Sequence, residues 1–179
     1  MQSASLTPDE PRRLDILDSL DVLDTPFDPV LDGIVRATAQ LIGCPVSLVS
    51  LVGAGRQWFK ARHGLDVQQI PREQAFCAHA ILQTDLFEVA DSRLDPRFAD
   101  NPIVTGEPHV IFYAGMPLSV DGQAMGTLCA IDHQPRRLTD EQRRSLKDMA
   151  RVVEHWLHSQ LVNHQLQRVD DDRRKLFDQ

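Results

Sequence analysis

Apolar and polar positions follow two different periods along the chain. Apolar residues recur at every third or fourth position over residues 14–23, over residues 29–42 and from residue 139 onward, which is typical of amphipathic helices. Between the second and the last of these segments lie short runs of β-branched and other apolar residues, separated by Gly, Pro and Asp. These runs predict at least five strands.

The helix over residues 29–42 is expected to follow the turn segment "DTPFDP" and to end at Gly43, a residue that suits the left-handed position after a helix. The shorter helix before it carries leucines at helical spacing, Leu14, Leu17, Leu20 and Leu23. In the second helix the same spacing predicts one face turned toward the core, formed by Val30, Ile34, Ala37 and Leu41.

The segment "PVSLVSLV" is apolar at both alternating sets of positions, which is typical of a central strand covered on both faces. "GAGR" then turns the chain, and "QWFKAR" is the returning strand of a hairpin, with Trp58 and Phe59 on opposite faces. Three later strands are expected at "LFEVAD", "VIFYAGMPLSV" and "AMGTLCAID", of which the last two are joined by the hairpin signal "DGQ".

The final helix carries two apolar stripes in succession. The first is an arc at about 100° per residue that is expected to pack on the sheet, and it contains Leu146, Met149, Ala150, Val153, Trp156, Leu157 and Leu161. The second is a short heptad seam, which contains Val162, Leu166, Val169 and Leu176, with Arg173 at one core position. We expect this seam to pair with a second copy of the chain. The closing residues "LFDQ" contain neither a cap nor a breaker, so the helix is expected to connect to a further domain.

Composition and charge narrow the class of protein. With 179 residues, of which 42% are hydrophobic and 25% charged, the chain has the composition of one globular domain with flanking helices. The formal charge of −7 gives no electrostatic reason to bind nucleic acid or anionic lipid. No apolar run approaches the roughly 18 residues that a membrane span needs, and the first residues lack the order of a secretory signal. A soluble, cytoplasmic protein is therefore expected.

The three cysteines lie far apart in the sequence and form no CxxC pair. Cys44, Cys77 and Cys129 therefore indicate reduced thiols rather than a disulfide framework or a zinc site with ligands close in sequence.

The segment "REQAFCAHAILQ" places Cys77 two residues before His79. Its alanine-rich composition and Pro71 at the expected first turn predict a helix. On a helix the two side chains diverge by about 200°, so they form neither a catalytic dyad nor a chelating pair. We expect a buried thiol on an apolar face with Phe76, Ala80 and Ile81, and a surface histidine paired with Gln83.

Six separated segments resemble, in order and spacing, the GAF domain found at the N-terminus of bacterial diguanylate cyclases and sensor histidine kinases. They are "LDSLDVLDTPFD", "GCPVSLVSLVGAGRQWFKARHGL", "AFCAHAI", "VADSRLDPRFADNPIV", "FYAGMPL" and "MGTLCAIDHQPRRLTDEQ". The resemblance covers roughly residues 12–160. It implies an α+β fold, with an antiparallel sheet of five or six strands, helices on one face and a ligand pocket between the other face and its covering loops. Residues 1–11 would then form an N-terminal tail, and residues 161–179 would begin a signalling helix.

The resemblance also implies the function. Such domains are sensory and dimerisation modules, usually without catalytic activity, whose last helix passes a signal to an output domain. The expected small-molecule pocket has aromatic walls and few polar groups, as ligand sites need. Its residues would be Trp58 or Phe59, with Phe76, Cys77, Asp91, Phe112 and Tyr113. The residues identify neither the ligand nor any cofactor.

Three known ligand or activity types of the family leave characteristic residues that this sequence lacks. Neither Asn101 nor Asn163 is followed by the lysine that is typical of cyclic-nucleotide binders, and "NPIVTGEPH" holds no cysteine for a bilin. Free methionine sulfoxide reductases resemble the chain at "FCA", but their catalytic cysteine lies near the segment that here reads "HVIFYAG". Ile111 also replaces an arginine that is common in relatives. A reductase of this type and a purely structural dimerisation module remain the alternatives.

Histidines give only weak indications of metal or haem binding. His155 and His158 stand three residues apart beside Glu154, a spacing that permits shared coordination, but the three lie off the apolar arc. His79 and His109 are isolated candidates for a haem ligand. Solvated side chains are the simpler interpretation, and no metal site is expected.

Overall fold

One antiparallel sheet organises the protein, which a computed structural model describes over residues 1–177. The strand order is β3-β2-β1-β6-β5-β4, and every neighbouring pair is antiparallel. The strands are β1 (Val46–Val52), β2 (Arg56–His63), β3 (Gln69–Pro71), β4 (Phe87–Val89), β5 (Phe112–Val120) and β6 (Gln123–Asp132). The expected sheet of five to six strands is confirmed.

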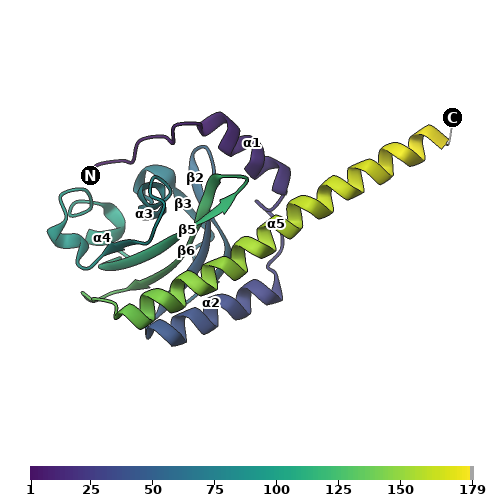
Figure 1. Cartoon of the computed structure of the whole chain (residues 1–179). Coiled ribbons are helices and arrows are strands. Elements are labelled where there is room, and N and C mark those ends of the chain that lie inside the picture. The colour runs from purple at the N-terminus through teal and green to yellow at the C-terminus, as the bar shows by residue number, and fades with distance from the viewer. Residues whose placement is uncertain (178–179) are drawn as a thin grey trace.

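Helices of different length cover the two faces of the sheet (Figure 1). The long helices α1 (Glu10–Leu20), α2 (Pro29–Ile42) and α5 (Asp140–Phe177) share one hydrophobic cluster with one face. The other face is covered by α3 (Phe76–Ala80), α4 (Pro102–Thr105), the 3₁₀ turns Arg72–Gln74 and Ser92–Leu94, and their connecting segments. This arrangement agrees with the α+β fold that the sequence implied.

The central strand β1 is buried along its whole length, as its continuous apolar sequence predicts. It lies very close to β6 at Gly126. A Cβ atom at this position would lie 2.7 Å from the carbonyl carbon of Ser50, so only glycine lets the two backbones approach this closely. On the other side of β1 the register with β2 shifts, because Val49 pairs with Ala61 while Ser50 pairs with Phe59. Lys60 is therefore an extra residue, a β-bulge.

Helix α2 has the predicted ends but a different buried face. Asp28 caps its start by accepting hydrogen bonds from the backbone of Val30 and Leu31, and Gly43 ends it with a φ of 73°. Val30 and Leu41, which were expected to face the core, are 59% and 54% exposed. The buried residues are Leu31, Ile34, Val35, Thr38, Ala39 and Ile42. Apolar residues occupy much of the circumference of this helix, so the helical spacing is compatible with two different apolar faces. Packing against the sheet and α5 determines which of the two is buried.

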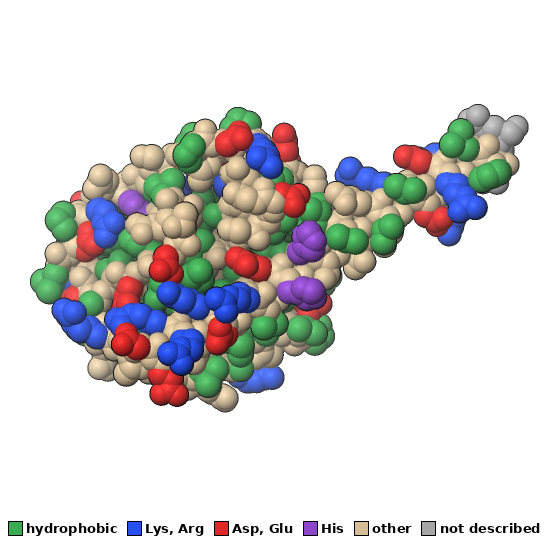
Figure 2. All heavy atoms as spheres, viewed as in Figure 1, with side chains coloured by type: hydrophobic (Ala, Val, Ile, Leu, Met, Phe, Trp, Pro, Cys, Tyr) green, Lys and Arg blue, Asp and Glu red, His purple; other side chains and the backbone are tan. Residues whose placement is uncertain are grey.

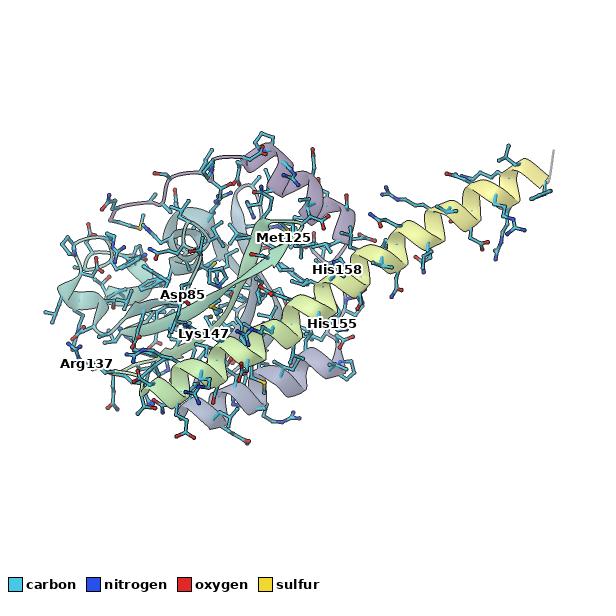
Figure 3. The ribbon with its side chains drawn as sticks, in the orientation of Figure 1. Asp85, Met125, Arg137, Lys147, His155 and His158 are labelled. Atoms are coloured by element: carbon cyan, nitrogen blue, oxygen red, sulfur yellow. The ribbon has the colours of Figure 1, made fainter. Side chains whose placement is uncertain are left out.

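Helix α5 begins with a reciprocal cap. The Thr139 hydroxyl accepts from the backbone of Gln142 at 3.1 Å, and the Gln142 side chain accepts from the backbone of Thr139 at 2.9 Å. Near its start, Lys147 forms an ion pair of 2.9 Å with Asp85, the residue two before β4 (Figure 3). The buried residues of the helix are Leu146, Ala150, Val153, Leu157 and Leu161, and Met149 and Trp156 are partly buried against the same cluster, which confirms the predicted arc.

The second half of α5 projects away from the domain (Figure 1). Apolar side chains stand along this projecting part, with histidines where the helix leaves the domain (Figure 2). The seam residues Val162, Leu166, Val169 and Leu176 are 40%, 63%, 68% and 75% exposed. No helix within residues 1–177 is both long enough and apolar enough to cross a membrane.

The N-terminal segment is attached to the domain, whereas residues 1–11 were predicted to be a tail. Helix α1 begins at Glu10, whose carboxylate accepts hydrogen bonds from the buried guanidinium groups of Arg13 and Arg72. Arg13 also donates to the carbonyl of Val52 at 2.8 Å, and Arg72 donates to that of Gly53 at 3.0 Å. These three charged residues, the Glu10 cluster, fasten α1 to the β1–β2 hairpin.

The segment around Cys77 departs from its prediction. Pro71 ends strand β3 instead of opening a helix, and Ala75 is extended, with a ψ of 124°. The helix therefore begins only at Phe76 and is five residues long. Strand β3 and helix α4 were not predicted, because they are too short to show a period in the sequence.

Candidate functional site

A cavity of about 110 Å³ lies between the sheet and the segments that cover the α3 side. The sheet contributes one wall, helix α3 a second, and the segments 65–70 and 103–110 enclose the rest. The lining residues are Leu48, Gln57, Phe59, Leu65, Val67, Ile70, Phe76, Ile103, Glu107, Pro108, Val110, Tyr113 and Ile131. The lining is therefore almost entirely apolar.

Three of the predicted site residues meet at this cavity. Phe59 comes from β2, Tyr113 from β5 and Phe76 from the start of α3. Phe76 lies 5.3 Å from Tyr113 between ring centroids and stacks on Phe98 at 4.1 Å. Such aromatic packing fixes the positions of the walls.

The other predicted residues lie elsewhere. Trp58 and Phe112 face α1, α2 and α5 on the opposite side of the sheet, because each precedes a cavity residue and successive strand residues point to opposite faces. Cys77 is buried beside the cavity residues without lining the cavity. Asp91 pairs with Arg93 at 2.8 Å and borders a surface hollow near Arg136. These four residues are therefore not part of the cavity wall.

Most of the residues that cover the cavity were not among the predicted site residues. Leu65, Val67 and Ile70 precede and enter β3, while Ile103 and Val110 lie in and after α4. Apolar residues in such short segments have no period that would distinguish a lid from a loop. Among the missed residues, Gln57 is the one whose position the sequence could have indicated. It lies two positions before Phe59 on the same strand and so points to the same face of the sheet.

The polar groups of the cavity are few and mostly engaged. The Tyr113 hydroxyl lies 3.2 Å from Thr127 Oγ1, and burial raises the pKa of Tyr113 well above its ordinary value. Gln57 is 4% exposed, and its Nε2 donates to Ser50 Oγ at 2.9 Å. Glu107 is the charged lining residue, and its side chain is 90% exposed at the rim.

The position of Tyr113 depends on Gly115, the next residue of β5 on the same face. A Cβ at position 115 would lie 2.7 Å from Tyr113 Cζ, which is closer than real atoms approach. We therefore expect Gly115→Ala to displace the ring and to lower the free energy of unfolding by about 1–3 kcal/mol, as overpacking does. Urea denaturation measures this change.

Gly33→Ala is the matched control for this prediction. Gly33 lies inside α2, where an added Cβ meets no atom closer than 3.9 Å. The same substitution there should raise stability by about 0.5–1 kcal/mol, because alanine loses less backbone entropy in a helix. Equal effects at the two positions would contradict the role assigned to Gly115.

The Cys77 thiol is poorly suited to nucleophilic chemistry. Its side chain is fully buried, and burial raises its pKa well above the ordinary value. Burial also raises the pKa of Cys129 to about 12 and that of Cys44 to about 11. We predict that a thiol reagent at neutral pH modifies the folded protein slowly and reaches Cys44 first, since Cys44 is 6% exposed while the other two are inaccessible. Preferential rapid labelling of Cys77, detected by peptide mass spectrometry, would overturn this prediction.

His79 lies at a partly buried position and does not pair with Gln83 as predicted. Its Nε2 lies 3.0 Å from the backbone carbonyl of Gln2, and its ring stands edge-on to Phe98 at 4.9 Å. Burial lowers the pKa of His79. The N-terminal segment, which runs past α3, therefore occupies the position that Gln83 was expected to take.

Metal-ligating side chains do not converge in the described part of the chain. Across residues 1–177 no three His, Cys, Asp or Glu side chains lie close enough together to hold an ion. His155 and His158 stand exposed on α5 (Figure 3). Glu154 instead accepts a hydrogen bond from the backbone of Ser119 at 2.9 Å and so joins α5 to β5.

A larger hollow of about 690 Å³ lies on the surface between β4 and the segment before α5. It is open to solvent, and four of its five charged side chains are held in ion pairs, such as Arg136 with Asp132 at 2.8 Å and Glu88 with Arg143 at 2.9 Å. The apolar cavity on the α3 side is less open and therefore has more of the features of a ligand site.

The antiparallel sheet, the enclosed cavity on one face and the long helix leaving from the other define an α+β domain of the kind found in signalling proteins. The chain belongs to the GAF domain family, whose sequence model matches residues 26–155. A cyclic di-GMP phosphodiesterase of Pseudomonas aeruginosa is 44% identical over 153 residues, which make up 84% of this chain and 26% of that protein. The chain thus spans about a quarter of the length of this relative.

Solved structures share the fold at low sequence identity. The GAF domain of a phosphoenolpyruvate-protein phosphotransferase from Acinetobacter matches with a TM-score of 0.61 and 18% identity, over 87% of this chain and 95% of that one. A type II free methionine-R-sulfoxide reductase from Thermoplasma acidophilum matches with a TM-score of 0.60 and 14% identity, over 73% of this chain and 91% of that one. At such identities the likeness concerns the fold and not the chemistry.

Proposed function

We propose that this chain is a non-catalytic sensory module that binds a small ligand in the enclosed cavity and passes the signal through α5 to an output domain in the cytoplasm. The observation that carries the proposal is the cavity itself, because a preformed, largely apolar cavity with aromatic residues in its wall is a common form of small-molecule site. The thiol chemistry of the reductase alternative lacks support, since Cys77 is fully buried and does not line the cavity.

The contacts of β2 support a route from the cavity to α5. Phe59 lines the cavity, while the next residue, Lys60, turns to the opposite side at the β-bulge. Its ammonium group donates to Thr25 Oγ1 at 2.8 Å and lies 5.7 Å from the ring centroid of Trp156 on α5. A shift of Phe59 on ligand binding would therefore move a contact of the signalling helix.

The projecting half of α5 supports a parallel homodimer as the form that transmits the signal. Its apolar seam is exposed in the single chain and has the spacing of a coiled coil. An isolated helix of this length is marginal in water, so a partner helix would stabilise it. The output domain would follow in the same polypeptide, and the cyclic di-GMP phosphodiesterase relative makes cyclic di-GMP turnover one activity that it could regulate.

A ligand screen with a blocked cavity tests the proposal. Val110 lines the cavity and is 3% exposed, so Val110→Phe should fill the space. Compounds that raise the melting temperature of the wild type, as ligands of the native state do, should not raise that of Val110→Phe. If no compound in a metabolite library distinguishes the two proteins, the structural dimerisation module becomes the better account. Turnover of free methionine sulfoxide that is lost in Cys77→Ser would instead establish the reductase.

A further inference from the structure

We infer that the ligand of the cavity is a small, uncharged, largely apolar molecule that carries one hydroxyl or N–H donor. This inference rests on the proposed function, because it takes the cavity to be the ligand site. It follows from the size of the cavity, the charges around it and one free hydrogen-bond acceptor in its wall. The three properties limit the ligand independently of one another.

The size of the cavity sets the first limit. Its volume is about 110 Å³, whereas pockets for drug-sized ligands measure roughly 300–1,000 Å³ and an engineered protein cavity of about 150 Å³ holds benzene. Val67 in the covering segment is 44% exposed, so a modest outward movement there would admit a six-membered ring. A cyclic dinucleotide or an open-chain tetrapyrrole would require the covering segments to leave the sheet.

The charges around the cavity set the second limit. Lysine, arginine and histidine are absent from the cavity lining, and the one charged residue in it is Glu107, whose side chain is exposed at the rim. A phosphate or carboxylate placed in the cavity would lose its hydration without gaining a cationic partner. The negative rim would also repel it. Anionic ligands are therefore excluded from this site.

Gln57 sets the third limit, which is the hydrogen-bond donor that the ligand is expected to carry. The side-chain amide is buried in the wall, and its Nε2 is used by Ser50. Among the hydrogen bonds within residues 1–177, none ends on Gln57 Oε1, so this oxygen is available as an acceptor. The Tyr113 hydroxyl, by contrast, is already bonded to Thr127. A ligand that donates one hydrogen bond to Gln57 Oε1 would therefore bind better than one of the same shape without a donor.

Benzene, phenol, benzoate and cyclic di-GMP test the three limits together. The full chain is titrated with each compound while NMR follows the methyl groups of Ile103 and Ile131, which line the cavity. We expect benzene and phenol to shift these signals, with phenol binding roughly fivefold more tightly, the effect of one net hydrogen bond. Benzoate and cyclic di-GMP should leave them unchanged.

Two variants and a matched control test whether Gln57 causes the preference for phenol and whether both compounds bind in the cavity. Gln57→Leu should make phenol and benzene bind equally, and Val110→Phe should abolish the binding of both. Gln123→Leu makes the same chemical change on β6 outside the cavity lining, so it should keep the roughly fivefold preference for phenol. Urea denaturation of each variant verifies that it is folded.

The possible outcomes separate the inference from the proposed function. If benzoate or cyclic di-GMP binds and Val110→Phe blocks it, the cavity is a ligand site but the inferred ligand class is wrong. A preference for phenol that survives Gln57→Leu would overturn the role of Gln57. If none of the four compounds shifts the cavity methyl signals, the inferred ligand class fails. The proposed function then still depends on the wider screen against Val110→Phe.

Discussion

Replacing Glu10 by alanine is expected to lower the free energy of unfolding by about 3–5 kcal/mol, the usual effect of removing one partner from a buried ion pair. Arg13 is fully buried and Arg72 is 9% exposed, so both guanidinium groups would lose their carboxylate without gaining water. Urea denaturation of the two proteins measures the difference. Asp148→Ala is the matched control, because it breaks an exposed ion pair with Arg151 and should cost well under about 1 kcal/mol.

The effect of Glu10 should also depend on pH. Burial alone would raise the pKa of its carboxyl group, but the hydrogen bonds from Arg13, Arg72 and Thr7 outweigh burial and hold the pKa well below its usual value. The folded state therefore gains stability from the carboxylate above the ordinary pKa of about 4.5, and this gain is lost progressively as the pH falls below it. The difference in the free energy of unfolding between wild type and Glu10→Ala should therefore be smaller at about pH 3 than at about pH 7, and the loss should occur below about pH 5. A difference that stays constant would show that the charge is not its source.

The Glu10 cluster also shows where sequence patterns stop being informative. Glu10 precedes the first leucine of its helix, a position typical of a solvated residue in a tail. Its burial could not be predicted from the local sequence, because its partner Arg72 lies 62 residues away. Strand β1 and helix α5 could be predicted, since continuous apolar sequence and a long helical period are local signals. The buried face of α2 could not, because the choice between two apolar stripes depends on the elements packed against it.

The cavity could be predicted only in part for the same reason. The aromatic residues of the strands and of α3 were visible as candidates, but whether Trp58 or Phe59 faces the cavity depends on the face that β2 turns to the long helices. The covering residues between 65 and 110 come from short irregular segments, where apolar side chains have no period. Gln57 was the one polar residue whose position, two before Phe59, could have indicated the wall.

Replacing Leu166 by aspartate should weaken dimerisation by roughly a hundredfold or more, because two unpaired carboxylates would meet in the seam of a parallel pair. Leu166 is 63% exposed in the single chain, so the fold of the domain should be unaffected. Val152 lies two heptads before Leu166 and is 49% exposed, but the seam positions between Val152 and Val162 hold the polar residues His155 and Ser159. The apolar contact between two copies would therefore lie along the projecting helix, from Val162 onward.

Arg173 lies one heptad after Leu166 and would face its own copy in such a dimer. Replacing it by leucine should remove this repulsion and tighten dimerisation by roughly tenfold, about 1.4 kcal/mol. Leu94→Asp is the matched control, because Leu94 is 82% exposed in the 3₁₀ turn Ser92–Leu94, outside the seam of α5, and should leave the association unchanged. Sedimentation equilibrium on the wild type and the three variants measures each effect. A wild type that stays monomeric, and that neither seam substitution alters, would rule out pairing through α5 and leave the projecting helix without a role in transmission.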